Sequence, residues 1–141
     1  LLYRSGVGLT PRPLRRIASG GELSRVMLAS KVVLGNADGV DTLVFDEVDA
    51  GVGGSTARAL AGVLADLAAT HQVIVVTHLA QVAVMADKHY VVSKEPGDVP
   101  QTHLDEVTGE ARTAEIARML SGDQSEASLA HAKQMLKEAR G

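Results

Sequence analysis

The stretch TLVFDEVDAGVGG, residues 42–54, decides the fold. Its apolar opening, Thr42 to Phe45, predicts a strand that is buried on both faces, as in a parallel sheet between helices. The strand ends in Asp46 and Glu47, at the sheet edge where open α/β folds bind ligands. In phosphoryl transfer such a pair divides its roles: the first acid helps to hold Mg²⁺ and the second accepts a proton from water or orients it. Taken alone, the pair is equally typical of two solvated acids at a turn.

A helix is predicted before this strand. Ser19 and Glu22 have the spacing of a capping box, in which each side chain satisfies a free backbone N–H of the first turn. The helix N-terminus favours an anion such as phosphate, and Gly20 and Gly21 would let the anion come close. Without further context, an ordinary helix cap explains the same residues. Apolar residues at helical spacing and a stop signal follow: Leu23, Val26, Met27, Val33 and Leu34, then Gly35 and Asn36.

A second helix and strand follow the acidic pair. A turn rich in glycine precedes Ser55, which is expected to cap a helix that ends at His71. The apolar run Val73 to Val76 predicts a second buried strand, which leads into Thr77 and His78 and a short helix over 79–86. The turn and the apolar helix face comprise Gly51, Gly53 and Gly54, then Leu60, Ala61, Leu64, Leu67 and Ala68.

The spacing of these features predicts one shared site. Ser19 precedes Asp46 by 27 residues, and His78 follows Asp46 by 32 residues. Each interval fits one crossover of roughly 30 residues between neighbouring parallel strands. We therefore expect the helix tip, the acidic pair and the histidine to meet at one edge of the sheet.

The two ends of the chain are less distinctive. Leu1 to Arg4 predicts a strand, and a first residue other than Met predicts a piece of a longer protein. Tyr90 to Ser93 predicts another strand, and a hairpin with 101–106 is expected beyond the breakers Pro96, Gly97 and Pro100. Two amphipathic helices are predicted to finish the chain: Ile116, Met119 and Leu120, then Leu129, Ala132, Leu136 and Ala139.

Composition excludes several classes. With 141 residues, 45% of them hydrophobic, the chain is expected to form one compact domain. A net charge of -3 argues against a stand-alone nucleic-acid binder, and three aromatic residues are too few for the stacking platforms of single-strand binders. Without cysteine, a disulfide framework or a cysteine zinc site is excluded. The absence of a long apolar run predicts a cytoplasmic protein with no membrane partner.

The remaining histidines and the first arginines carry weaker signals. None of the histidines has metal-ligand spacing, so we expect surface or partly buried side chains and no zinc enzyme. The arginines are expected in a solvated loop, with phosphate contact as the alternative. These residues are His71, His89, His103 and His131, then Arg4, Arg12, Arg15 and Arg16.

Three segments in order resemble the head of an ABC-type ATPase: SGGELSR (19–25) its signature motif, TLVFDEVDAGVGG its Walker B motif and D-loop, and VTHLAQVA (76–83) its switch histidine. The sequences of these three segments are most similar to those of the RecN family of SMC-like ATPases, which repair DNA double-strand breaks. The resemblance implies a P-loop NTPase fold of the ABC/SMC type. Because no Gly-x-x-x-x-Gly-Lys-Ser/Thr occurs, it also implies the C-terminal half of such a head, without the P-loop.

The resemblance implies ATP and Mg²⁺ as ligands and an ATPase reaction in the intact protein. Asp46 would assist Mg²⁺, Glu47 would activate water, and His78 would contact the γ-phosphate. Residues Ser19, Gly20, Gly21 and Glu22 would cover ATP held by a second head, and Asp49 would couple the two sites. The implied partners are the N-terminal half with the P-loop, a second copy of the head and DNA at the nucleoid.

Two alternatives stay open. The chain by itself is also compatible with a non-catalytic interaction module, because it lacks the P-loop. A transporter cassette is the other alternative, although such cassettes usually carry glutamine at the position of Glu22 and proline at that of Val48.

Overall fold

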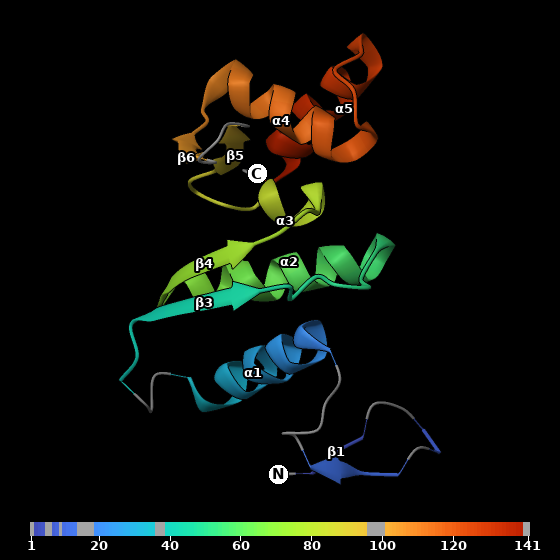
Figure 1. Cartoon of the computed structure of the whole chain (residues 1–141), viewed down its shortest axis with the longest axis vertical. Coiled ribbons are helices and arrows are strands. Elements are labelled where there is room, and N and C mark those ends of the chain that lie inside the picture. Colours follow the sequence, from blue (N-terminus) through green and yellow to red (C-terminus); the bar gives the residue numbers. More distant parts are fainter. Residues whose placement is uncertain are drawn as a thin grey trace. The chain divides into compact units, whose positions relative to one another are not determined.

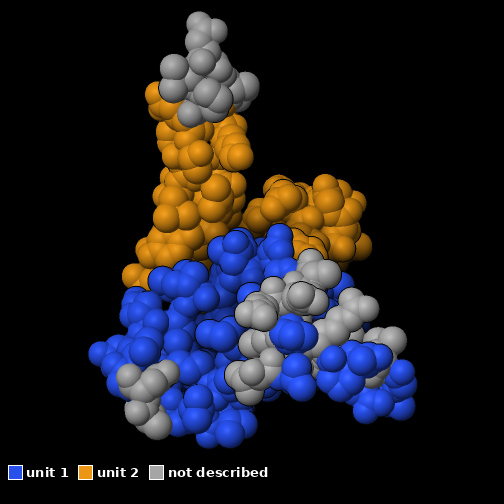
Figure 2. Space-filling view, turned by 60° about the horizontal axis from the view of Figure 1, so that its bottom comes forward, with its two compact units in different colours: residues 1–77 blue, residues 78–141 orange. Residues whose placement is uncertain are grey.

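The computed structural model describes residues 2–4, 7–8, 10–13, 19–35, 39–95 and 101–139. The chain forms two compact units, Leu1–Thr77 and His78–Gly141, where its length predicts one (Figure 2). Several sequence predictions fall outside the described residues: the helix stop at Asn36, Arg15 and Arg16, the Arg12 side chain, and the breakers Pro96, Gly97 and Pro100.

The first unit contains a parallel strand pair with its connecting helix, as predicted. Strand β3 (Thr42–Asp46) lies beside β4 (Gln72–Val76), and α2 (Gly54–Ala68) joins them. Helix α1 (Gly20–Leu34) contacts β3, and α2 contacts β4. The arrowheads of β3 and β4 and the start of α1 lie at the same end of this unit (Figure 1).

The chain start forms a small ribbon. Strand β1 (Leu2–Tyr3) pairs antiparallel with β2 (Arg12–Pro13). The strand predicted over Leu1 to Arg4 is thus present as β1, with Leu1 itself outside the described residues.

Among the described residues, only one face of the β3–β4 sheet is covered, which corrects the prediction of strands buried on both faces. Leu43 and Phe45 are buried, at 9% and 4% exposure, but Val44 between them is 65% exposed. On β4, Ile74 and Val76 are likewise exposed. The reason is the alternation of side chains along a strand: α1 and α2 cover the face of Leu43 and Phe45, and the other face keeps its apolar residues in solvent.

Helix α2 begins earlier than predicted. Gly53 is its N-cap, in an extended conformation, and Gly54 opens the helix with a φ of 56°. Ser55 therefore lies inside the first turn and is not the cap. Ser55 directly follows Gly54, and the two glycines start the helix without a side-chain acceptor because they can adopt backbone angles that other residues avoid.

The second unit holds the rest of the predicted elements. Helix α3 (Ala80–Ala83) precedes the antiparallel hairpin of β5 (Tyr90–Glu95) and β6 (Gln101–Glu106). Helices α4 (Gly109–Ser121) and α5 (Glu126–Glu138) pack on one another and on α3. In the turn between them, Asp123 Oδ1 accepts hydrogen bonds from Ser121, Ser125 and Ser128, and these bonds lower the pKa of Asp123 to about 2.

None of the helices in the described part of the chain has the length and apolar character that crossing a membrane requires.

Candidate functional site

The N-terminus of α1 has the predicted cap. Ser19 is extended, and its Oγ accepts a hydrogen bond of 3.2 Å from the backbone N–H of Glu22. Ser19 and Gly20 are exposed, whereas Gly21 is buried. The tip of α1 is therefore exposed at Ser19 and Gly20, and a helix N-terminus carries the partial positive charge that suits it to an anion.

The first turn of α1 packs directly on the loop that follows β3. A Cβ added to Gly21 would lie 2.7 Å from the Glu47 carbonyl oxygen and 2.8 Å from the Ala50 Cβ. A Cβ added to Gly20 would lie 2.7 Å from Glu47 Oε2. Gly21 thus has a packing reason, because it lets the helix approach the acidic loop, whereas at Gly20 only the Glu47 side chain is near.

Two side chains of α1 hold this approach, and the sequence patterns predict no role for either. The Ser24 hydroxyl donates to the Asp46 carbonyl at 2.6 Å. Arg25 Nη1 donates to the carbonyls of Val48 and Ala50, at 3.1 and 2.9 Å. Arg25 comes four residues after Gly21, so the two share a helix face, and this spacing is the signal that could have identified Arg25.

Glu47 leaves the strand in a left-handed conformation. Its φ is 55°, and no other residue besides glycine has a positive φ in the described part of the chain. Such a conformation costs roughly 1 kcal/mol for an L-residue, and the surrounding contacts must hold it. Its carbonyl accepts from the Ala50 N–H at 3.0 Å. The Asp46 and Glu47 side chains are both exposed, so both carboxylates can reach a ligand in solvent.

The third acid of the loop is turned inward. Asp49 is 1% exposed, and its Oδ2 accepts a hydrogen bond of 2.5 Å from the Thr77 hydroxyl. Thr77 follows β4 directly, so this bond ties the loop after β3 to the end of the neighbouring strand. The coupling of two sites by Asp49 stays a prediction.

The structure thus brings most of the predicted residues together at one end of the first unit: Ser19, Gly20, Gly21, Glu22, Asp46, Glu47 and Asp49. His78 follows Thr77 in the chain but is the first residue of the second unit, so its participation stays a prediction. In the described part of the chain, no group of three or more His, Asp or Glu residues is arranged to hold a metal ion. The role of Asp46 as a Mg²⁺ ligand stays a prediction.

Replacing Arg25 by methionine is expected to lower the free energy of unfolding of the chain by about 1.5 kcal/mol. Methionine keeps the apolar stem but leaves the carbonyls of Val48 and Ala50 without the guanidinium donor. Urea unfolding measures the difference. Arg58→Met, at an exposed position on α2, is the matched control and should change stability by less than about 0.5 kcal/mol. Equal stability of the two variants would contradict the importance of these bonds.

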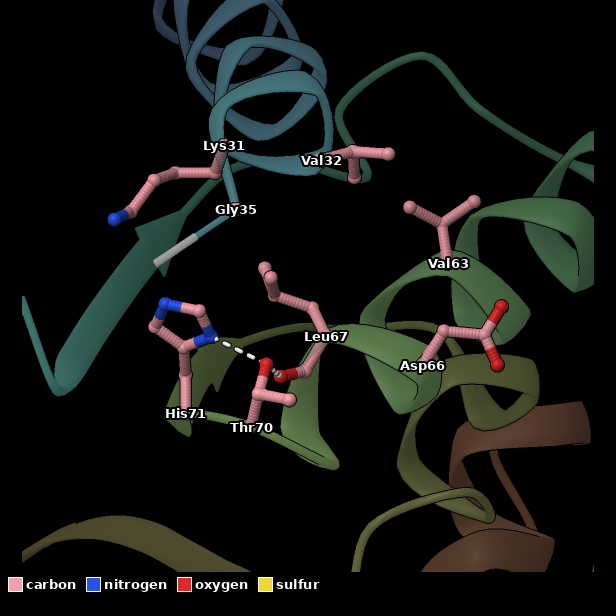
Figure 3. A pocket seen from close by; sticks show the side chains of 8 residues that line it. All are labelled: Lys31, Val32, Gly35, Val63, Asp66, Leu67, Thr70 and His71. Carbon is pink, nitrogen blue, oxygen red and sulfur yellow. Dashed lines mark hydrogen bonds between the residues drawn. The ribbon is translucent and has the colours of Figure 1, made fainter. Parts of the chain in front are cut away.

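A pocket of about 260 Å³ lies away from these residues, at the C-terminal ends of α1 and α2 (Figure 3). Lys31, from the last turn of α1, and His71, just after α2, both line it. His71 is 6% exposed, which corrects the prediction of a surface or partly buried histidine. Its Nδ1 lies 2.9 Å from the Thr70 hydroxyl, and the ring is held against the end of α2. None of the predicted site residues lines this pocket.

Over nearly its whole length, the chain is similar in sequence to one group of known proteins. It is 52% identical over 138 residues to the DNA repair protein RecN of Treponema pallidum, which covers 96% of this chain and 24% of that protein. The RecN proteins of Deinococcus radiodurans and Streptomyces coelicolor are 57% and 49% identical over 137 and 142 residues, covering 96% and 99% of this chain and 24% and 25% of the relatives. The chain therefore spans about a quarter of their length. No family model matches the chain.

A solved structure shows the same fold. It comes from work on the ATP-driven dimerization and DNA-stimulated activation of SMC ATPases, and it matches 95% of this chain and 68% of its own with a TM-score of 0.52 at 20% identity. The predicted fold class, the α/β fold of an ABC/SMC-type ATPase head, is confirmed. That the chain is the C-terminal half of such a head stays a prediction.

Proposed function

We propose that this chain, which is similar over nearly its whole length to one quarter of the DNA repair protein RecN, supplies one half of a composite ATP site in an SMC-like ATPase. The intact protein would hydrolyse ATP to ADP and phosphate and act on DNA in double-strand break repair. It would work in the cytoplasm, at the nucleoid.

One observation carries the proposal: the first turn of α1 and the loop 46–50 form a single packed structure. Gly21 leaves no space between them, and Arg25 and Ser24 donate to the loop carbonyls. This structure exposes Ser19 and Gly20 at the helix tip and the side chains of Asp46 and Glu47 in the loop. A phosphate site shared between two heads needs both properties on each head.

The exposed residues fit a magnesium nucleotide. Asp46 would hold Mg²⁺, which neutralises charge on the phosphates when bound. Glu47 would accept a proton from the attacking water, and His78 would donate a hydrogen bond to a γ-phosphate oxygen. Ser19, Gly20, Gly21 and Glu22 would cover the nucleotide of the opposite head. Asp49, held by Thr77, would couple the two sites.

The remaining parts come from outside these 141 residues. The sequence contains no P-loop, so the N-terminal half of the same protein would bind the phosphates of ATP. A second copy would complete the site, because a two-fold arrangement places the same surface against itself.

Replacing Ser19 by arginine in the complete protein is expected to abolish ATP-dependent dimers. The larger, positively charged side chain would stand at the exposed helix tip that is proposed to cover the nucleotide of a second head. Binding of ATP to a single head should be retained, because the P-loop is on another segment. Sedimentation with and without ATP measures dimers, and fluorescence titration with a labelled ATP analogue measures binding.

The matched control for Ser19→Arg is Ser30→Arg, the same substitution at an exposed position on the same helix. Ser30 lies three turns from the helix tip, so dimers should form normally. Dimers that persist in Ser19→Arg would reject the proposed role of this helix tip.

A further inference from the structure

The short helix α3 lies immediately after His78. It has a single turn, and the N–H groups of Val82 and Ala83 donate to the Leu79 carbonyl at 3.0 and 3.1 Å. A helix of this length has little stability of its own, because the conformational entropy lost in forming the first turn exceeds the free energy gained from its hydrogen bonds. On its C-terminal side, the backbone that carries His78 is therefore held in place by whatever α3 packs against, while Thr77 on the other side is held by Asp49.

Arg112 of α4 binds the end of α3. Its side chain is 6% exposed, and its Nη2 donates to the carbonyls of Ala83, Val84 and Ala86 at 3.2, 3.3 and 2.6 Å. The last carbonyls of a helix carry the negative end of its dipole, and a cation there stabilises them. Arg112 therefore acts as a C-terminal cap that comes from a different helix.

Apolar packing fixes the same contact. Ala80, Ala83 and Val84 share one buried cluster with residues of the last two helices: Ile116 and Ala117 of α4 and Ala132 of α5, each 0% exposed. Small side chains let α3 lie close to α4, which brings its carbonyls within reach of Arg112. The hydrogen bonds and the apolar contacts together fix the position of α3 relative to α4.

We propose that Arg112 is a positioning residue for His78: it holds the α3 turn and so fixes the backbone from which His78 reaches the γ-phosphate. This inference rests on the proposed function, since it requires His78 to act in hydrolysis. It assigns to α4, a helix outside the three sequence motifs, a part in setting the rate of the reaction.

The test is a double-mutant cycle in the complete protein, with Arg112→Gln, His78→Ala and the double variant. Arg112→Gln should lower kcat about tenfold and change KM less than about twofold, because misplacing a group at the reacting centre slows the step without weakening nucleotide binding. Arg112→Lys should recover most of the rate, because its ammonium can still donate to the carbonyls. The double variant should be as slow as His78→Ala alone.

Arg118→Gln is the matched control, because Arg118 lies on the same helix with its side chain 57% exposed and pairs with Glu115. Its kcat should be normal. The positioning role would be overturned if the fold-losses of kcat in the two single variants multiply in the double variant, or if Arg112→Gln has a normal kcat. Either result would leave the proposed function intact. A normal kcat in His78→Ala would overturn the role of His78 and this inference together. If Arg112→Gln does not fold, Arg112→Lys takes its place in the cycle. Its smaller loss of kcat should then be absent when His78→Ala is already present, so that the double variant has the kcat of His78→Ala.

Discussion

Glu47→Gln in the complete protein is expected to lower the rate of ATP hydrolysis at least a hundredfold while ATP-dependent dimers persist. A glutamine amide has the shape of the glutamate side chain, but it cannot accept a proton from water at neutral pH. The close approach between this side chain and Gly20 can therefore survive, and so can the left-handed backbone at position 47. The loss should fall on kcat, with ATP binding unchanged.

Phosphate release measures hydrolysis, and sedimentation in the presence of ATP measures dimers. Glu110→Gln is a control of the same chemistry, because Glu110 is exposed in the first turn of α4, in the second unit. It should hydrolyse ATP at the normal rate. Undiminished hydrolysis in Glu47→Gln would count against Glu47 as the base. Loss of ATP binding would show instead that the substitution disturbs the loop.

The first unit could largely be predicted from local patterns. The apolar runs at Thr42–Phe45 and Val73–Val76 gave the two strands, and the Ser19 cap gave the start of α1, because each pattern records an interaction within a few residues. Parallel pairing followed from the length of the crossover. The order of the three motifs then predicted a similarity to RecN proteins and the fold of an SMC-type head, and the comparisons confirm both.

What could not be predicted depends on contacts that are distant in sequence. An apolar run cannot reveal that Val44 is exposed, because covering that face depends on which helices are present. Arg25 donates to carbonyls that are 23 and 25 residues away in the sequence. The motif SGGELSR alone does not show where the side chain of Arg25 points. The prediction of a surface or partly buried His71 is wrong for the same reason, since the burial of His71 comes from the packing of the end of α2.

The division of the chain into two units also lay beyond sequence reasoning. Length and composition give the amount of apolar surface but not the number of separate clusters that it forms. The cluster of α3, α4 and α5 closes around Ile116 and Ala117 without the strands β3 and β4. As a consequence, the third motif is divided: Val76 and Thr77 belong to the first unit, and His78 begins the second.

Gly21→Ala is expected to destabilise the chain by about 3 kcal/mol, the upper end of the usual cost of overpacking. The added methyl group would lie 2.7 Å from the Glu47 carbonyl oxygen and 2.8 Å from the Ala50 Cβ, both fixed by the backbone. Relief therefore requires α1 to move away from the loop, which would also break the hydrogen bonds of Arg25. Urea unfolding of the chain measures the loss.

Two other glycines separate this packing effect from the general effect of alanine in a helix. A Cβ at Gly62, inside α2, has no atom outside its own helix backbone within 4 Å among the described residues, so Gly62→Ala should stabilise by about 0.5–1 kcal/mol. A Cβ at Gly20 approaches only the Glu47 carboxylate, which can rotate away, so Gly20→Ala should cost less stability than Gly21→Ala and yet displace the proposed base. In the complete protein, Gly20→Ala should therefore slow hydrolysis more than its stability change explains. If Gly21→Ala is as stable as Gly62→Ala, α1 does not pack on the loop after β3, and the shared structure on which the proposed site depends is absent.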